Sequence, residues 1–159
     1  MLCIGALATA AGIAACGGSS SKADVSTAFN KSIKTTILVD NRGRTLYMFG
    51  LDGRNGTPTC TDDSTYHCSK AWPPLLAKNA PKAGKNVNAA LLKTIKRQDG
   101  TMQVTYNGYA LYTFNGYHLG NAPDAAADTK AGDLHGQGYI SSWWVLSPAG
   151  KPLTAMPSA

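Results

Sequence analysis

The fold is decided by a stretch of sequence that occurs twice, first as Val39-Asp40-Asn41-Arg42-Gly43-Arg44-Thr45-Leu46-Tyr47-Met48-Phe49 and again as Val104-Thr105-Tyr106-Asn107-Gly108-Tyr109-Ala110-Leu111-Tyr112-Thr113-Phe114. The two copies align without gaps at a constant offset of 65, and five of their eleven positions are identical. Identity at apolar and turn positions is what a duplicated supersecondary unit retains. The sequence therefore predicts two repeats, at about 36–77 and 101–150.

Each copy is predicted to form a β-hairpin. In the second copy, Asn107-Gly108 lies between two apolar runs, which is the strongest short-range signal for a two-residue turn. In the first copy, Asp40-Asn41-Arg42-Gly43 fits a slightly longer turn with Gly43 in the left-handed conformation. A third hairpin is expected from Lys93–Arg97 and Thr101–Val104, with an Asp-Gly turn between them.

Residues 86–97 also fit a helix, but Thr94, Ile95 and the Asp-Gly that follows favour a strand, preceded by one helical turn at Asn88–Leu92. Alternate residues of Leu46–Phe49 point to opposite faces of a strand and are apolar on both, so this strand is expected to lie between two layers. The sequence predicts an all-β or β-rich fold, a single compact domain over 33–154 with at most short helical turns, and a tail at 155–159.

The first fifteen residues, Met1–Ala15, are uncharged, small and apolar. This run is shorter than the roughly 20 residues of a membrane-spanning helix and is typical of the apolar region of an export signal. Its end, Ile13-Ala14-Ala15-Cys16, resembles the lipobox of bacterial lipoproteins, whose cysteine thiol receives a diacylglycerol. We therefore predict a signal peptide at 1–15, lipidation of Cys16, a flexible tether at 16–32 and an extracytoplasmic location at the cell membrane. The alternative is an ordinary secretory signal followed by a chance cysteine.

Cys60 and Cys68 are the cysteines that remain after export and lipidation, because Cys3 leaves with the signal. Outside the cytoplasm a lone pair of thiols is expected to oxidise, so a structural disulfide is predicted. The alternative is a metal site that also uses His67. Adjacent His67 and Cys68 do not converge easily on one ion, and the sequence has no CxxC motif.

Composition restricts the chemistry of this chain. Its 159 residues carry 15 Lys and Arg against nine acidic residues, all of them Asp, for a net charge of +6. The absence of Glu excludes the HExxH and EF-hand motifs, and neither GxSxG nor a spare thiol is present. We therefore predict no enzymatic activity and no cofactor. The basic residues are scattered apart from Lys93, Lys96 and Arg97, so we expect anionic lipids or wall polymers, and not nucleic acid, as partners of the positive surface.

Three polar features have residue types suited to binding. Asp52 follows the first repeated strand, where we favour an Asx-type turn over a ligand contact. The glycine-rich segment 132–138 could present backbone N–H groups to an anion, but a tight connection is the favoured interpretation. A divalent metal could be bound by a set of loop side chains, against the alternative of a solvated excursion: His118, Asp124, Asp128, Asp133 and His135.

Aromatic residues gather near the same segments. Trp143 and Trp144 alternate across a strand, so one is expected in the core and the other outside it. An exposed ring could stack on a ligand together with aromatic residues in the motif regions, although core packing is the favoured interpretation: Tyr66, Trp72, Tyr109 and Tyr117.

Tyr47-Met48-Phe49-Gly50-Leu51-Asp52 is a YxFxxD motif, and further motifs follow it in order up to about residue 150. Together they resemble the bacterial lipoproteins and secreted repeats that carry a conserved YxFxxD motif. The resemblance is carried by Tyr47, Phe49, Asp52, Trp72, Pro73, Pro74, Tyr112, Phe114, Gly132, Asp133, Gly136, Gly138 and Trp143. In the second copy Tyr117 stands where the motif has Asp, so the role of Asp52 is not expected to be repeated there.

The resemblance implies an exported lipoprotein of unknown activity. We expect a non-catalytic binding or structural module, lipid-anchored at the cell surface, that contacts a wall polymer, a small ligand or a surface protein. The alternative is a metal-binding or redox-accessory lipoprotein that uses His118, Asp133 and His135.

Overall fold

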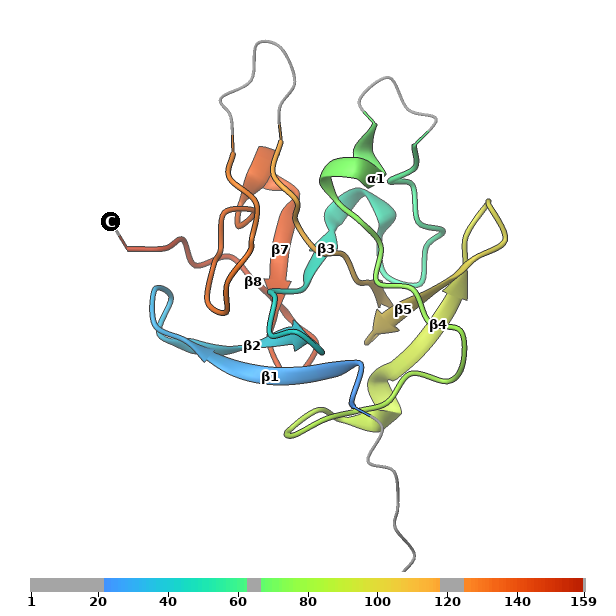
Figure 1. The fold of residues 1–159 in the computed structure, drawn as a ribbon, viewed down its shortest axis with the longest axis horizontal. Helices are drawn as coiled ribbons and strands as arrows, with labels where there is room; N and C mark the ends of the chain where they lie inside the picture. The colour runs from blue at the N-terminus through green and yellow to red at the C-terminus, as the bar shows by residue number, and fades with distance from the viewer. Residues whose placement is uncertain (1–21, 63–66, 118–124, 159) are drawn as a thin grey trace, which may run out of the picture.

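The computed structural model describes residues 22–62, 67–117 and 125–158 (Figure 1). The predicted signal peptide and Cys16 lie outside these residues, as do Tyr66, His118 and Asp124. Within them, eight strands form three small sheets, with one turn of α-helix and three 3-10 turns. The predicted β-rich fold with only short helical turns is confirmed.

All three sheets are antiparallel. The first pairs β1 (Val25–Asn30) with β2 (Thr35–Asp40), and the second has the order β3 (Tyr47–Phe49), β7 (Trp143–Leu146), β8 (Pro152–Leu153). The third has the order β4 (Leu92–Lys96), β5 (Met102–Tyr106), β6 (Tyr109–Ala110). The helical turns are η1 (Gly50–Asp52), α1 (Cys68–Ala71), η2 (Ala89–Leu91) and η3 (Tyr139–Ser141).

β1 lies inside the predicted tether, so the prediction of a tether at 16–32 is wrong from Val25 onward. Val25 is fully buried and pairs with Asp40, and the register continues to Asn30 opposite Thr35. Because few residues of this segment are large and apolar, its local composition resembles that of a linker. Its pairing with β2, which composition does not reveal, satisfies its backbone and makes it part of the domain.

The first repeat forms its turn but not a full hairpin. The N–H of Asp40 donates to the carbonyl of Arg44 at 2.8 Å, and Gly43 has a φ of 85°, as predicted. After one bridge between Val39 and Thr45, the two strands separate. β2 then pairs with β1, whereas β3 pairs with β7 from the second repeat.

The second repeat forms the predicted hairpins. Asn107 and Gly108 have φ values of 50° and 82°, which fit a type I′ turn between β5 and β6. β4 and β5 pair along their full length, with a left-handed Gly100 in the connecting turn. The helical alternative for 86–97 is wrong, because only η2 forms there before β4 begins.

The two repeats interlock instead of packing as separate units. Tyr47 and Tyr112, which are equivalent in the repeats, face each other in an antiparallel bridge with reciprocal N–H to carbonyl hydrogen bonds of 2.9 Å. Tyr47 also pairs with Val145, and Tyr112 with Pro74, so each repeat's tyrosine strand pairs with the segment around the other repeat's tryptophan. Reciprocal bonds between equivalent residues place an approximate two-fold axis between the tyrosines.

Six buried aromatic side chains, three from each repeat, meet around this axis: Tyr47, Phe49, Trp72, Tyr112, Phe114 and Trp143. The two indole rings stack with centroids 3.7 Å apart and an angle of 4° between their planes. Each tryptophan has the tyrosine of its own repeat packed edge-on against it, with ring centroids 5.4 Å apart for Trp72 and 5.2 Å apart for Trp143. The phenylalanine of the other repeat lies with its ring centroid 4.2 Å from that of each tryptophan. The arrangement is similar on both sides of the axis, although Phe49 is stacked on Trp143 at 14° and Phe114 is tilted by 34° against Trp72, and it forms the main core.

β3 separates this aromatic core from a second, largely aliphatic one. Leu46 and Met48 are buried in the second cluster, with Leu38, Val104 and Leu146 among their neighbours. The prediction that the repeated strand is apolar on both faces is confirmed, because it lies between two layers of the core.

Candidate functional site

Two buried aspartates join the repeats to each other. The hydroxyl of Tyr112 donates to Asp52 Oδ2 at 2.6 Å, and the hydroxyl of Tyr47 donates to Asp128 Oδ2 at 2.5 Å. Each aspartate therefore accepts the hydroxyl of the other repeat's motif tyrosine. Both carboxylates are almost completely buried, with residue exposures of 6% for Asp52 and 3% for Asp128.

The second oxygen of each carboxylate is bound in the same way in both repeats. Asp52 Oδ1 accepts the backbone N–H and the hydroxyl of Thr59, both at 2.7 Å. Asp128 Oδ1 accepts the backbone N–H of His135 at 2.9 Å and lies 3.1 Å from Nδ1 of that histidine. In each case the donor lies seven residues after the aspartate.

The expectation that the second repeat has no counterpart of Asp52 is therefore wrong. Asp128 takes the role, but it lies 16 residues after Tyr112, whereas Asp52 lies five residues after Tyr47. A gap-free alignment places Tyr117 at the motif position and misses this residue. The sequence offers no signal for it, because the donor seven residues later is a backbone N–H, carried by Thr59 in one repeat and by His135 in the other.

Burial and the neighbouring carboxylates raise the pKa of both tyrosines, so both hydroxyls remain protonated donors at neutral pH. Burial also raises the pKa of Asp128, although the hydrogen bonds from Tyr47 and His135 act in the opposite direction. The two tyrosine hydroxyls and the two carboxylates are buried and hydrogen-bonded to each other across the repeats, so these pairs hold the repeats together.

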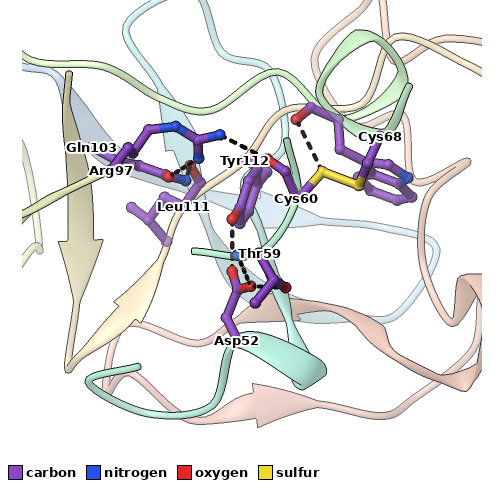
Figure 2. Close-up of a disulfide and its surroundings, with 9 residues drawn as sticks. Asp52, Thr59, Cys60, Cys68, Arg97, Gln103, Leu111 and Tyr112 are labelled. Atoms are coloured by element: carbon purple, nitrogen blue, oxygen red, sulfur yellow. Dashed lines mark hydrogen bonds between the residues drawn. A yellow bond between two sulfur atoms is a disulfide. The ribbon is translucent and has the colours of Figure 1, made fainter. Parts of the chain in front are cut away.

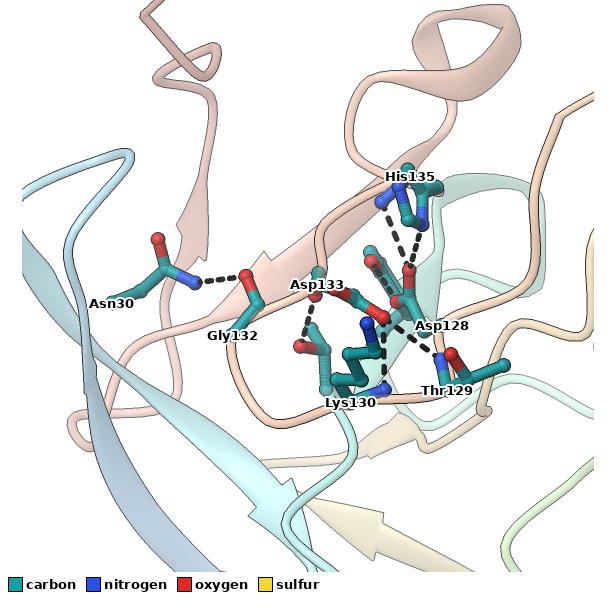
Figure 3. Close-up of polar contacts among 9 residues, drawn as sticks. Asn30, Asp128, Thr129, Lys130, Gly132, Asp133 and His135 are labelled. Atoms are coloured by element: carbon teal, nitrogen blue, oxygen red, sulfur yellow. Dashed lines mark hydrogen bonds and ion pairs between the residues drawn. The ribbon is translucent and has the colours of Figure 1, made fainter.

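Among the described residues, Asp128, Asp133 and His135 lie close enough together to hold one metal ion. One oxygen or nitrogen from each of the three lies within 4.8 Å of the others (Figure 3). Asp133 Oδ2 already accepts the N–H groups of Thr129 and Lys130 at 2.9 and 2.8 Å, and these bonds lower the pKa of Asp133. Asp133 and His135 are thus brought together with Asp128.

The glycine-rich segment 132–138 packs against the core. Asn30 donates its amide to the carbonyl of Gly132 at 3.0 Å, and Thr45 donates its hydroxyl to the carbonyl of Asp133 at 2.6 Å (Figure 3). A Cβ atom on Gly136 would lie 2.6 Å from the ring of Trp72, so only glycine fits beneath the indole. These contacts fit the favoured interpretation of a tight connection.

The predicted disulfide between Cys60 and Cys68 is present, and the two sulfurs are therefore not metal ligands (Figure 2). The carbonyl of Cys60 accepts a hydrogen bond of 2.7 Å from the buried guanidinium of Arg97. A second bond of 2.6 Å joins this guanidinium to Gln103, which donates to the carbonyl of Leu111 at 2.8 Å. Arg97 therefore ties the disulfide segment to the β4–β5 hairpin instead of contributing to a basic surface with Lys93 and Lys96.

An open pocket of about 490 Å³ lies beside the aromatic core. Its floor is formed by buried rings from the core, and its rim includes Leu51 and Ile140, which are 71% and 64% exposed. The remaining lining residues are Thr59, Cys68, Tyr117 and Tyr139. Of the two consecutive tryptophans, Trp143 lines this pocket from the core, whereas Trp144 is half-buried against the aliphatic cluster.

Sequence reasoning did not single out Leu51, Tyr139 or Ile140. Ile140 has a φ of 45°, and Ser141, which follows it, has a φ of 53°. A left-handed conformation is rare for a residue branched at Cβ and costs about 1–3 kcal/mol. Such strain is invisible in the sequence, and here it presents an exposed isoleucine at the edge of an apolar pocket.

The pocket and the start of the described chain lie at different ends of the molecule. Figure 1 shows α1 and the start of β7 in the upper part of the molecule and β1 in the lower part. Residues from η1, α1, η3 and β7 contribute to the pocket, so the elements that form it lie away from the start of β1.

These features define a β-rich, disulfide-linked module built from two interlocked repeats. Residues 93–116, from β4 to the end of the second repeated strand, match the model of a family described as a secreted repeat of unknown function. The match agrees with the resemblance predicted from sequence for this segment, whereas the YxFxxD motif at 47–52 lies outside the matched residues. No curated protein and no solved structure gives a significant match.

The description of this family as a secreted repeat suggests an extracellular location. In the part of the chain that the structure describes, no helix has the length and apolar character needed to cross a membrane.

Proposed function

We propose that this protein is a lipid-anchored, extracytoplasmic binding module that uses the aromatic pocket to hold a ligand. The observation that carries the proposal is the pocket itself, an apolar concavity of about 490 Å³ with exposed, partly strained apolar residues on its rim. Concave, mostly apolar sites of this size are the usual form of small-ligand sites. The secreted-repeat family and the disulfide support a location outside the cytoplasm.

The proposed anchor and the pocket are compatible in their positions. Eight residues lie between Cys16 and Val25, and the fully extended chain from one to the other spans at most about 32 Å. A lipidated Cys16 would therefore keep the β1 end of the domain close to the membrane. The elements that form the pocket lie in the opposite part of the domain, so the pocket would be held away from the bilayer.

Anchoring and orientation are tested together in bacteria that process lipoproteins. We expect the N-terminal peptide of the membrane-bound protein to carry an acylated Cys16 in mass spectrometry, and a Cys16→Ser variant to be released into the medium or periplasm. In intact cells, a membrane-impermeant maleimide should label a Leu51→Cys variant, because Leu51 is 71% exposed at the pocket rim. Unchanged membrane retention of Cys16→Ser would overturn the lipid anchor.

A second function, metal binding, has one specific observation in its favour, the convergence of Asp128, Asp133 and His135. Its test is elemental analysis of protein purified without a histidine tag. A stoichiometric transition metal that is lost in a His118→Ala/His135→Ala double variant and in Asp133→Asn would support it. The hydrogen bonds already made by Asp128 and Asp133 favour the pocket as the functional site.

A further inference from the structure

We propose that lysines along β1 form a basic edge that docks on the anionic lipid surface of the membrane and sets the orientation of the domain there. The inference rests on the proposed lipid anchor for its location at a membrane. The basic edge consists of six exposed side chains: Lys22, Lys31, Lys34, Lys78, Lys82 and Lys85.

The positive charge of this chain is concentrated in two segments. Residues 22–34 and 78–88 carry six of the 15 basic residues and, in Asp24, one of the nine acidic residues. Their net charge is +5, whereas all other residues together have a net charge of +1. Because 43 residues of sequence separate the two segments, the sequence alone shows scattered basic residues and no cluster.

The fold brings the two segments together beside β1. The N–H of Asp24 donates to the carbonyl of Lys82 at 2.9 Å, and the hydroxyl of Thr27 donates to the carbonyl of Lys85 at 3.2 Å. Figure 1 shows β1 in the lower part of the molecule, with the yellow-green segment that contains residues 78–88 beneath it. Lysines that are distant in sequence therefore lie on the same border of the domain.

The basic edge follows β1 from one end to the other. Lys22 lies three residues before the first residue of the strand. Lys82 and Lys85 lie beside its first half, and Lys31 and Lys34 lie in the turn that leads to β2. Since β2 is the strand partner of β1 on one side only, the other side of β1 is a border of the sheet.

The lysines of the basic edge are not used to build the fold. Among the described residues, ion pairs include none of five of them: Lys22, Lys31, Lys34, Lys78 and Lys85. All four arginines lie outside the two segments, and Arg44, Arg54 and Arg97 are bonded within the fold. A lysine amine is a point charge without the planar fork of arginine, which suits a diffuse anionic surface.

The position of the proposed anchor selects a bilayer as the partner. The chain from Cys16 to Val25 spans at most about 32 Å, so an anchored protein keeps the basic edge within reach of the lipid headgroups. A lipid chain and a basic patch act together as two signals for stable membrane binding. Exposed charges are screened beyond about 8 Å at physiological ionic strength, so the basic edge adds to the anchor and does not replace it.

Vesicle binding tests the basic edge without the anchor. The protein is the chain from Gly17 to Ala159, which keeps every element that the structure describes and has neither the predicted signal nor Cys16. In co-sedimentation at low salt, we expect it to bind vesicles with about 30% phosphatidylglycerol at least about tenfold more tightly than vesicles of phosphatidylcholine alone. Salt at about 0.5 M should abolish this preference.

Two double variants with the same change in net charge connect the binding to the basic edge. Lys78→Gln/Lys85→Gln should weaken binding to the phosphatidylglycerol vesicles about tenfold or more. Lys96→Gln/Lys130→Gln removes two exposed lysines from outside the basic edge and should change binding by less than about twofold. Circular dichroism checks that both variants are folded.

The outcomes separate this inference from the proposed function. Equal binding to the two kinds of vesicle, or equal effects of the two double variants, would overturn the basic edge as a docking surface. Tighter binding per phosphate to soluble poly(glycerol phosphate) than to the phosphatidylglycerol vesicles would overturn the bilayer as its partner. Because the protein tested has no acyl chain, none of these results depends on the anchor. The anchor is overturned separately, if Cys16→Ser protein stays in the membrane fraction of cells after a high-salt wash.

Discussion

At the scale of single residues, the reciprocal tyrosine–aspartate pairs account for the motif tyrosines and for Asp52. A buried carboxylate needs donors for its oxygens, and each aspartate obtains one from the tyrosine of the other repeat and one from a backbone N–H seven residues later. The motif residues Tyr47 and Asp52 therefore make contacts between the repeats, and a substitution in one repeat should remove a hydrogen bond from the other.

Removal of either tyrosine hydroxyl should destabilise the fold. Tyr47→Phe and Tyr112→Phe each leave a buried carboxylate oxygen short of a donor, at a cost of about 1–3 kcal/mol in the free energy of unfolding. Urea denaturation measures the loss. Tyr109→Phe, at a half-buried position of β6, is the control and should change this free energy by less than about 0.5 kcal/mol. Equal effects at all three positions would contradict a specific role for the pairs.

Asp128 should make stability depend on pH in the acid range. Burial raises its folded-state pKa above the ordinary value of 3.8, so the folded state binds this proton more tightly than the unfolded state does. The stabilising contribution is fully present below about pH 4 and is lost as pH rises through the folded-state value. The free energy of unfolding of the wild type, relative to that of Asp128→Asn, should therefore increase as pH falls from neutral toward about 4. A difference that stays constant over this range would refute the assignment.

At the scale of elements, the disulfide and Arg97 hold the segment around Cys60 against the rest of the fold. The chain from Thr59 to α1 is attached to the β4–β5 hairpin through the bond between Arg97 and the carbonyl of Cys60, and the pocket residue Cys68 lies at the start of α1 (Figure 2). These links fix where Trp72 enters the aromatic core.

Loss of the disulfide should lower stability without unfolding the strands. For a loop of this length, Cys60→Ser is expected to reduce the free energy of unfolding by about 2–4 kcal/mol, measured by thermal or urea denaturation. Titration of the folded, exported wild-type protein with a thiol reagent should detect neither Cys60 nor Cys68. Two reactive thiols would disprove the bridge in the exported protein.

At the scale of the whole molecule, the interlocked repeats imply that neither repeat folds alone. The strand of Tyr47 takes its partner from the second repeat, and Pro74 of the first repeat pairs with Tyr112. A fragment with one repeat therefore has an unpaired strand and only half of the stacked tryptophan pair.

This architecture can be tested by dividing the chain in the exposed segment between Lys85 and Asn86. We expect residues 22–85 and 86–158 to be unfolded separately and to form a folded 1:1 complex when mixed, as followed by circular dichroism and size-exclusion chromatography. Independent folding of either fragment would contradict an interlocked core.

Several features of this protein are determined by local sequence. The turns at Gly43 and Asn107-Gly108 follow from backbone conformations that few other residues adopt, and the two-faced strand Leu46–Phe49 follows from its apolar pattern. The Cys60–Cys68 bridge follows from counting the thiols that remain after export. In each case the cause is local: a backbone conformation of one or two residues, the alternation of side chains along a strand, or the oxidation of the two remaining thiols.

Other features were decided only by tertiary structure. β1 becomes a strand because β2 lies beside it, and Asp128 replaces the expected motif position because the fold brings it to Tyr47 across 81 residues. The pocket and the strained Ile140 exist only where η1, α1, η3 and β7 meet. Hydrogen-bond partners, burial and backbone strain depend on which distant segments come together, and no local pattern of residues specifies that.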